Sequence, residues 1–185
     1  MTDSSQSQDA NLERDLKLAH ASIRDVPNFP KPGILFRDIT PMLNDPKACR
    51  AVVKGLAQPW KGKVDLVAGM ESRGFIFGSL LAQELEVGFI PIRKPGKLPY
   101  KTESVSYGLE YGTDTLEIHI DACPDGQRVL ICDDLIATGG TAVAASQLIE
   151  RVGGKLAGYS FVIELKDLLG RAKLKNVPIE VLFSE

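Results

Sequence analysis

The sequence predicts an α/β protein with a mostly parallel central sheet flanked by helices. Short apolar runs recur at 64–68, 87–93, 128–132 and 156–165, and most are followed by a stretch with helical periodicity. Hydrophobic residues make up 44% of the 185 residues and charged residues 25%, values typical of globular proteins. Alternation of strands and helices favours parallel strands, because the chain must cross back over the sheet between them.

The elements before the sheet can be assigned from caps and prolines. Residues 1–10 are polar and acidic and predict a disordered tail. Apolar residues at helical spacing between 12 and 23 indicate a short amphipathic helix. The prolines that follow predict an extended segment over 34–38. Asp45 before Pro46 is a typical helix start, and that helix is expected to end near Pro59.

The remaining chain alternates, apart from one long irregular stretch at 94–113. Loops of that length inside a compact domain are usually lids or binding loops. Strands are expected at 64–68, 87–93, 116–120, 128–132, 156–165 and 179–183, and helices at 74–86, 141–152 and 166–173. The strand at 116–120 alternates apolar and polar residues, which predicts one exposed face. We therefore expect a single domain over 11–185 with a lid loop at about 94–113.

Composition excludes several classes of function. Lys and Arg total 22 against 24 Asp and Glu, which argues against a broad basic face for nucleic acid. Three widely spaced cysteines form no C-x-x-C pair, so a disulfide framework is not expected and a reducing, cytoplasmic setting is. No apolar run is long enough to span a membrane, and the first residues lack the pattern of a signal peptide.

The most informative segment covers residues 129–141. Four apolar residues form a buried strand, Asp133 and Asp134 follow, and the turn Thr138-Gly-Gly-Thr141 leads into a helix. Ligands of open α/β sheets bind at the carboxyl ends of strands, and a glycine turn at a helix N-terminus favours phosphate. The carboxylates would repel a phosphate, so sugar hydroxyls or a hydrated metal ion suit them better. The alternative, a helix cap and a plain turn, accounts for a lone pair of aspartates but not for the whole pattern.

This segment resembles the signature of phosphoribosyltransferases that bind 5-phosphoribosyl 1-diphosphate (PRPP). The stretches Pro30-x-Pro-Gly-Ile-Leu-Phe-Arg-Asp-Ile39, Glu71-Ser-Arg-Gly-Phe75, Ile92-Arg-Lys-x-Gly-Lys-Leu-Pro99 and Tyr107-x-Leu-Glu-Tyr-Gly112 resemble the adenine phosphoribosyltransferases. The resemblance runs from about residue 11 to the end. It implies the type I phosphoribosyltransferase fold with a long lid loop, an N-terminal hood segment and a homodimer.

The resemblance also implies a reaction and a PRPP site. The family transfers the 5-phosphoribosyl group of PRPP to adenine in purine salvage, giving AMP and pyrophosphate, with Mg²⁺ held mainly by PRPP oxygens and water and no direct protein ligand. Asp133 and Asp134 would hold the ribose hydroxyls, and residues 137–141 the 5′-phosphate. The residues expected to bind PRPP are Glu71, Ser72, Arg73, Arg93, Lys97, Asp133, Asp134, Ala137, Thr138, Gly139, Gly140 and Thr141.

Two further groups are implied for the base. Glu110 and Tyr111 match the family's catalytic pair, and a lid carboxylate could accept the proton lost when the purine nitrogen attacks. Leu35, Phe36, Arg37 and Leu135 match the residues around the base: Phe36 and Leu135 stack on it, and main-chain groups of Leu35 and Arg37 read its edge.

Plainer interpretations stay open for these residues. Arg73 could be a surface arginine paired with Glu71, Glu110 a surface glutamate at a strand start, and Tyr107 a simple anchor of the loop. A relative that uses hypoxanthine, guanine or xanthine is the closest rival enzyme. A regulator that only senses PRPP or a nucleotide is the rival from another class, although such regulators usually carry a DNA-binding domain.

Overall fold

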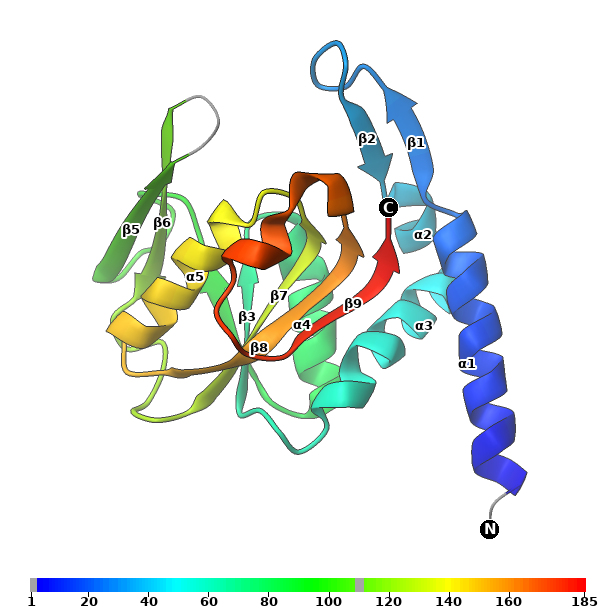
Figure 1. Ribbon diagram of the computed structural model, residues 1–185. Helices are drawn as coiled ribbons and strands as arrows, with labels where there is room; N and C mark the ends of the chain where they lie inside the picture. Colours follow the sequence, from blue (N-terminus) through cyan, green and yellow to red (C-terminus); the bar gives the residue numbers. More distant parts are fainter. Residues whose placement is uncertain (1–2, 109–111) are drawn as a thin grey trace. The chain divides into compact units, whose positions relative to one another are not determined.

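The computed structural model describes residues 3–108 and 112–185, and in it the chain divides into two compact units, residues 1–55 and 56–185 (Figure 1). The prediction of one domain from residue 11 is not tested by this division. Each unit is described by itself below.

The first unit contains three helices and a small hairpin: α1 (Asp3–Ala21), β1 (Arg24–Pro27), β2 (Leu35–Asp38), α2 (Thr40–Asn44) and α3 (Pro46–Ala57), whose last turn crosses the boundary. Helix α1 covers residues 3–10, which the sequence predicts as a disordered tail. Strand β1 was not predicted, and it pairs antiparallel with β2 in register from Arg24↔Asp38 to Pro27↔Leu35. Its short polar sequence has no apolar alternation, so the pairing depends on backbone hydrogen bonds and cross-strand charges.

The second unit is built on a five-stranded sheet in the order β4-β3-β7-β8-β9, and each neighbouring pair is parallel. Its strands are β3 (Leu66–Met70), β4 (Gly88–Ile92), β7 (Arg128–Ile136), β8 (Lys155–Glu164) and β9 (Ile179–Ser184), joined partly by α4 (Arg73–Leu85) and α5 (Gly140–Arg151). This confirms the predicted fold class. The short 3₁₀ turn η1 (Gln58–Trp60) precedes the sheet.

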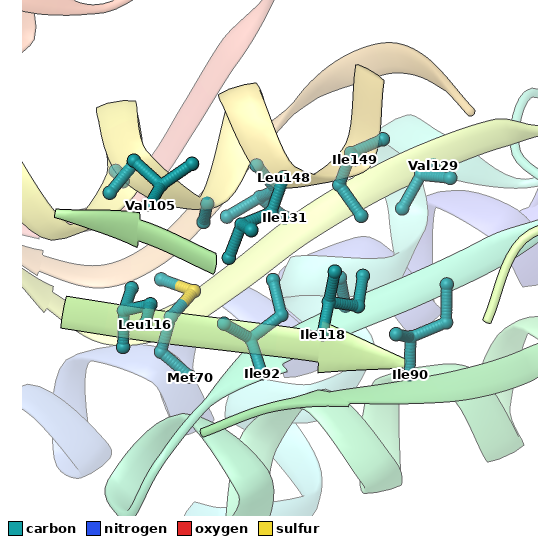
Figure 2. Packing of buried hydrophobic residues seen from close by; sticks show 14 of the residues in the cluster. Met70, Ile90, Ile92, Val105, Leu116, Ile118, Val129, Ile131, Leu148 and Ile149 are labelled. Carbon is teal, nitrogen blue, oxygen red and sulfur yellow. The ribbon is translucent and has the colours of Figure 1, made fainter. Parts of the chain in front are cut away.

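Helix α4 lies behind the sheet and helix α5 in front of it in the view of Figure 1, so the two helices cover opposite faces. On the α4 side, a Cβ at Gly69 would lie 2.8 Å from the carbonyl oxygen of Gly74, so only glycine permits this approach. The other face carries the main apolar core, where Leu148 and Ile149 of α5 lie over Val129 and Ile131 of β7 (Figure 2).

The stretch predicted as an irregular lid loop contains a β-hairpin. Strand β5 (Thr102–Gly108) pairs antiparallel with β6 (Thr113–His119), and Val105 faces Leu116 in the core. The hairpin is joined to the sheet by hydrogen bonds between the backbones of Arg93 and Glu117. The prediction of an irregular stretch over 94–113 is therefore wrong for 102–108, where Val105 is the one buried residue of a mostly polar strand and apolar alternation is absent.

Two further predictions differ from the structure. The helix expected at 166–173 is a pair of 3₁₀ turns, η2 (Lys166–Leu168) and η3 (Gly170–Lys173), because Leu169 between them adopts a left-handed conformation with φ of +52°. Strand β7 continues to Ile136, so Asp133 and Asp134 lie within its final residues and not after its end. Among the described residues, no helix is both long enough and apolar enough to cross a membrane.

Candidate active site

A cavity of about 430 Å³ opens at the carboxyl ends of β3 and β7. Parallel strands place the loops that follow them at the same edge of the sheet, which is where α/β proteins bind ligands. Most of the predicted PRPP-binding residues line it, together with Leu135: Glu71, Ser72, Arg73, Asp133, Asp134, Ala137, Thr138, Gly139, Gly140 and Thr141. Sequence segments 60 residues apart are thus brought together around one space.

The acidic pair lies at the floor of this cavity. The backbone N–H of Asp134 donates to Oδ1 of Asp133 at 2.9 Å, and the side chain of Asp134 is almost completely buried. A Cβ at residue 74 would lie 2.7 Å from Oδ1 of Asp133, so Gly74 makes room for that carboxylate. Loss of hydration and the charge of Asp134 raise the pKa of Asp133 well above its ordinary value. Hydroxyl donors or a cation from a ligand would replace the hydration that the carboxylate has lost and would stabilise its charged form.

Arg73 supplies the balancing charge. Its Nε lies 3.1 Å from Oδ2 of Asp134, and Arg73 is the first residue of α4. Burial raises the pKa of Asp134, and the charge of Arg73 opposes that rise without cancelling it. The guanidinium of Arg73 pairs with Asp134, whereas the carboxylate of Glu71 pairs with Arg93 and Lys97. The Glu71–Ser72 peptide bond just before it is cis.

The turn after β7, residues 137–141, is the segment predicted to bind phosphate and is called the phosphate loop below; it opens α5 at the cavity. Gly139 has a φ of +80° and caps α5, a conformation that side chains rarely adopt. No acidic residue occurs in the first turn of α5, and Gly140, Thr141 and Ala142 of that turn line the cavity, so the N–H groups and partial positive charge of the helix N-terminus lie at the cavity. The hydroxyl of Thr141 donates to the phenol oxygen of Tyr107 at 3.3 Å.

Arg93 and Lys97, also predicted to bind PRPP, converge on Glu71 and do not line the cavity. Nε of Arg93 lies 2.8 Å from Oε2 of Glu71, and Nζ of Lys97 lies 3.2 Å from Oε1. Burial raises the pKa of Glu71, but hydrogen bonds from Arg93, the Lys94 backbone and Lys97 together lower it below its ordinary value. Glu71 is therefore an anion already satisfied by two cations.

The cavity is also lined by three polar residues that the sequence did not assign to PRPP binding. Nζ of Lys94 lies 2.7 Å from Oδ2 of Asp114, and the phenol of Tyr107 donates to the same oxygen at 3.3 Å. The hydrogen bond from Lys94 lowers the pKa of Asp114, and the same pair raises the pKa of Lys94. The alternation of β6 could have revealed Asp114, whose position two residues before Leu116 places it on the core side. Tyr107, predicted as an anchor, contacts the phosphate loop.

The remaining predicted residues lie elsewhere. Glu110 and Tyr111 are outside the described residues. Leu35, Phe36 and Arg37 belong to β2 in the first unit, where the ring of Phe36 meets that of Phe29 edge to face at 5.1 Å. Arg37 pairs there with Asp25. The roles of these five residues in binding and catalysis stay predictions.

A resident metal would have few protein ligands here. No three His, Cys, Asp or Glu side chains converge on a common point in the part of the chain that the structure describes. Of the acidic side chains lining the cavity, Asp134 is paired with Arg73 and Asp114 with Lys94. A divalent cation that keeps water and ligand phosphate oxygens, as Mg²⁺ does, fits this donor set.

Comparison with known proteins agrees with the geometry. The model of the phosphoribosyl transferase domain matches residues 41–177. An adenine phosphoribosyltransferase of a Cyanothece species is 60% identical over 161 residues, which cover 86% of this chain and 95% of that one.

Solved structures give the same result. The adenine phosphoribosyltransferase of Rhodothermus marinus has a TM-score of 0.89 and 50% identity, covering 94% of this chain and 99% of its own. The Saccharomyces cerevisiae enzyme, solved with an imino-altritol bisphosphate and adenine, has a TM-score of 0.87 and 41% identity over 92% and 99%.

The fold and the cavity thus define a protein of the type I phosphoribosyltransferase class. Within that class, the chain belongs to the adenine phosphoribosyltransferase family.

Proposed function

We propose that this chain is a purine-salvage enzyme whose cavity binds PRPP. It transfers the 5-phosphoribosyl group of PRPP to adenine and releases AMP and pyrophosphate. The observation that carries the proposal is the juxtaposition of a phosphate loop and a buried acidic pair in one cavity. A phosphorylated sugar needs both, and the family to which the chain belongs binds such a ligand.

Each part of the cavity suits one part of PRPP. The N–H groups of residues 137–141 and the hydroxyls of Thr138 and Thr141 donate to the 5′-phosphate. Asp133 and Asp134 accept from the ribose hydroxyls, which relieves the two carboxylates whose pKa values are raised. Arg73 lies beside Asp134, where its guanidinium can meet the pyrophosphate as two hydrogen-bond donors. The ribose therefore lies between a site for the 5′-phosphate and a site for the pyrophosphate.

Mg²⁺ bound to the pyrophosphate and ribose oxygens would neutralise the charge of the leaving group. Asp133 and Asp134, which line the cavity, would accept hydrogen bonds from its water ligands. The protein's own task is to orient the ribose, to exclude water from the developing cation at C1′ and to accept the proton from the purine. Glu110 is assigned that last step, with Tyr111 beside it in the sequence.

We assign adenine to the part of the cavity beside Leu135. By the family resemblance, Phe36 is assigned to stacking on the base, and main-chain groups of Leu35 and Arg37 are assigned to its edge. A 6-oxo purine presents the opposite hydrogen-bond polarity, and the buried groups it would leave unpaired cost about 1–3 kcal/mol each. A homodimer and a cytoplasmic location belong to this proposal as well.

The proposal is tested by a coupled assay with PRPP, Mg²⁺ and each purine base in turn. AMP formation from adenine alone supports it. Turnover of hypoxanthine, guanine or xanthine in place of adenine would assign the chain to a different specificity. Binding of PRPP with no turnover of any base would favour the PRPP-sensing regulator.

A further inference from the structure

The back of the phosphate loop is packed against the main chain of a distant residue, Gly170. A Cβ at Gly139 would lie 2.5 Å from the carbonyl oxygen of Gly170. A Cβ at Gly170 would overlap the carbonyl oxygen of Ala137 and lie 2.8 Å from the nitrogen of Gly139. Both distances are far below normal contact, so two backbones meet here with no space for a side chain.

The segment that carries Gly170 is held firmly on the β8 side. Nε and Nη2 of Arg171 each lie 3.0 Å from one carboxylate oxygen of Glu164, which is nearly buried on β8. The backbone N–H of Leu165 donates to the carbonyl of Ile136 at 3.0 Å. These contacts hold Gly170 in place against the loop, because bidentate Arg–carboxylate pairs restrict orientation as well as distance.

The backbone at the preceding residue, Leu169, adopts an unfavourable conformation that brings Gly170 to the loop. Leu169 adopts a left-handed conformation with φ of +52°, and 71% of its surface is exposed. Left-handed conformations cost a residue with a Cβ on the order of 1 kcal/mol, and an exposed leucine gains nothing from burial. The bend at Leu169 interrupts the helix predicted over 166–173 and turns the following residue toward the loop.

Gly170 itself does not need a glycine for its own backbone. Its φ lies outside the left-handed region, so alanine would be permitted there by conformation alone. The side chain is excluded only by the neighbouring loop. Glycine is therefore required at position 170 by the close approach of the phosphate loop and not by the backbone conformation of the 3₁₀ turn that contains it.

We propose that Gly170 is a positioning residue for the 5′-phosphate site. Contact with its main chain fixes the positions of Ala137 and Gly139, and therefore the direction in which the N–H groups of the loop point. The inference rests on the proposed function, in which residues 137–141 bind the 5′-phosphate. It identifies the ligand part affected. PRPP and AMP both carry a 5′-phosphate and should both depend on Gly170, whereas pyrophosphate should not.

The test is Gly170→Ala, measured in pyrophosphorolysis, where AMP and pyrophosphate are varied separately. We expect the KM for AMP to rise at least tenfold, with the KM for pyrophosphate within twofold and kcat within about threefold. A displaced phosphate contact weakens ground state and transition state alike, which raises KM and leaves kcat nearly unchanged. Titration calorimetry with AMP should show the same loss of affinity.

Gly154→Ala is the matched control. A Cβ there would lie 2.8 Å from Cγ2 of Ile149 and 2.9 Å from Sγ of Cys123, a crowded position whose neighbours do not line the cavity. This variant should lower Tm without changing the ratio of the two KM values. A selective rise of the KM for AMP in the control would overturn the inference.

Arg171→Gln provides a second probe that adds no atoms to the contact. Loosening the anchor should raise the KM for AMP at least threefold with pyrophosphate unaffected, and it carries the test if Gly170→Ala does not fold. Unchanged AMP affinity in the folded variants, or a parallel loss for AMP and pyrophosphate, would refute the positioning role. A wild-type protein that neither binds AMP nor uses adenine would instead refute the proposed function.

Discussion

Glu71 lines the cavity, but its carboxylate is already paired with two cations. Its carboxylate is nearly buried and accepts from Arg93 at 2.8 Å and from Lys97 at 3.2 Å. An unpaired carboxylate would repel pyrophosphate. The carboxylate of Glu71 instead forms ion pairs with the two cations that the family resemblance assigns to PRPP binding. We infer that Glu71 orients Arg93 and Lys97.

This role predicts the sign of a charge-removing substitution. Glu71→Gln should raise the KM for pyrophosphate at least fivefold in pyrophosphorolysis, because two cations lose their orientation. If Glu71 acted only by repulsion, the same change would lower that KM. Glu117→Gln is the control, since its carboxylate accepts from the backbone of Gly96 and removal of its charge leaves the Glu71 pairs intact.

Glu110 offers a second residue-scale prediction, derived from the sequence motif. Glu110→Gln keeps the size of the side chain but removes its capacity to accept a proton. Loss of a general base typically costs 10² to 10⁴ in rate, so we expect kcat to fall at least about 100-fold with the KM for PRPP within about threefold. Equal losses in kcat and in PRPP affinity, measured by steady-state kinetics and calorimetry, would contradict the assignment.

Some of the residues that line or support the cavity could be predicted from the sequence, and others could not. Asp133, Asp134 and the Thr-Gly-Gly-Thr turn are contiguous, so their proximity is local and could be predicted. Tyr107 and Asp114 become neighbours only when β5 pairs with β6, and Lys94 reaches Asp114 only once that hairpin lies beside residue 94. Gly170 was invisible for another reason, since a glycine that is required only by a distant loop resembles any other turn glycine in the sequence.

At the scale of elements, regular apolar strands were predicted well and marginal ones were not. Val64–Ala68 and Arg128–Cys132 have apolar runs, and β3 and β7 appear within a few residues of them. Strands β1 and β5 have polar sequences, because each belongs to a two-stranded antiparallel sheet with a solvent-exposed face. Their formation depends on partners that local periodicity does not reveal.

The hairpin of β1 and β2 gives a pH-dependent prediction. Asp38 accepts from the backbone and hydroxyl of Thr40 and from Arg24, and hydrogen bonding, led by the Thr40 backbone N–H, lowers its pKa to about 2. A carboxyl whose folded pKa lies below its ordinary value of 3.8 stabilises the fold above that value. The contribution is then lost as pH falls from about 4 toward about 2.

Asp38→Asn should therefore reduce the free energy of unfolding by roughly 1–2 kcal/mol at pH 7, a range discounted for the exposure of Arg24. Urea titrations at pH 7 and pH 3 would check this, because the difference between the two proteins should shrink at the lower pH. Asp45→Asn is a useful comparison, since Asp45 caps α3 through the backbone of Lys47 but forms no ion pair among the described contacts. A difference at Asp38 that stays constant with pH would show that its charge is not involved.

At the scale of the whole second unit, a single apolar core supports the cavity from below. Met70 ends β3 directly before Glu71, Ile131 lies two residues before Asp133, and both are fully buried in that core. Figure 2 shows them with Leu148 of α5 and with Leu116 and Ile118 of β6. The acidic pair, the loop after β3 and the hairpin thus share one packed foundation, which limits how far any of them can shift alone.

If the hairpin is part of this foundation, truncating its inward side should cost as much as truncating the sheet. Ile118 is fully buried, so Ile118→Ala should lower the free energy of unfolding by about 3 kcal/mol and Tm by roughly 6–12 °C. Ile120, just beyond β6, is 42% exposed, and Ile120→Ala should cost less than about 0.5 kcal/mol. Thermal unfolding of both variants beside the wild type makes the comparison, and a similar small effect at both positions would show a hairpin that unfolds independently of the sheet. Such a hairpin could not hold Tyr107 against the phosphate loop, so this stability measurement also tests whether the wall of the cavity at Tyr107 and Asp114 is part of the folded core.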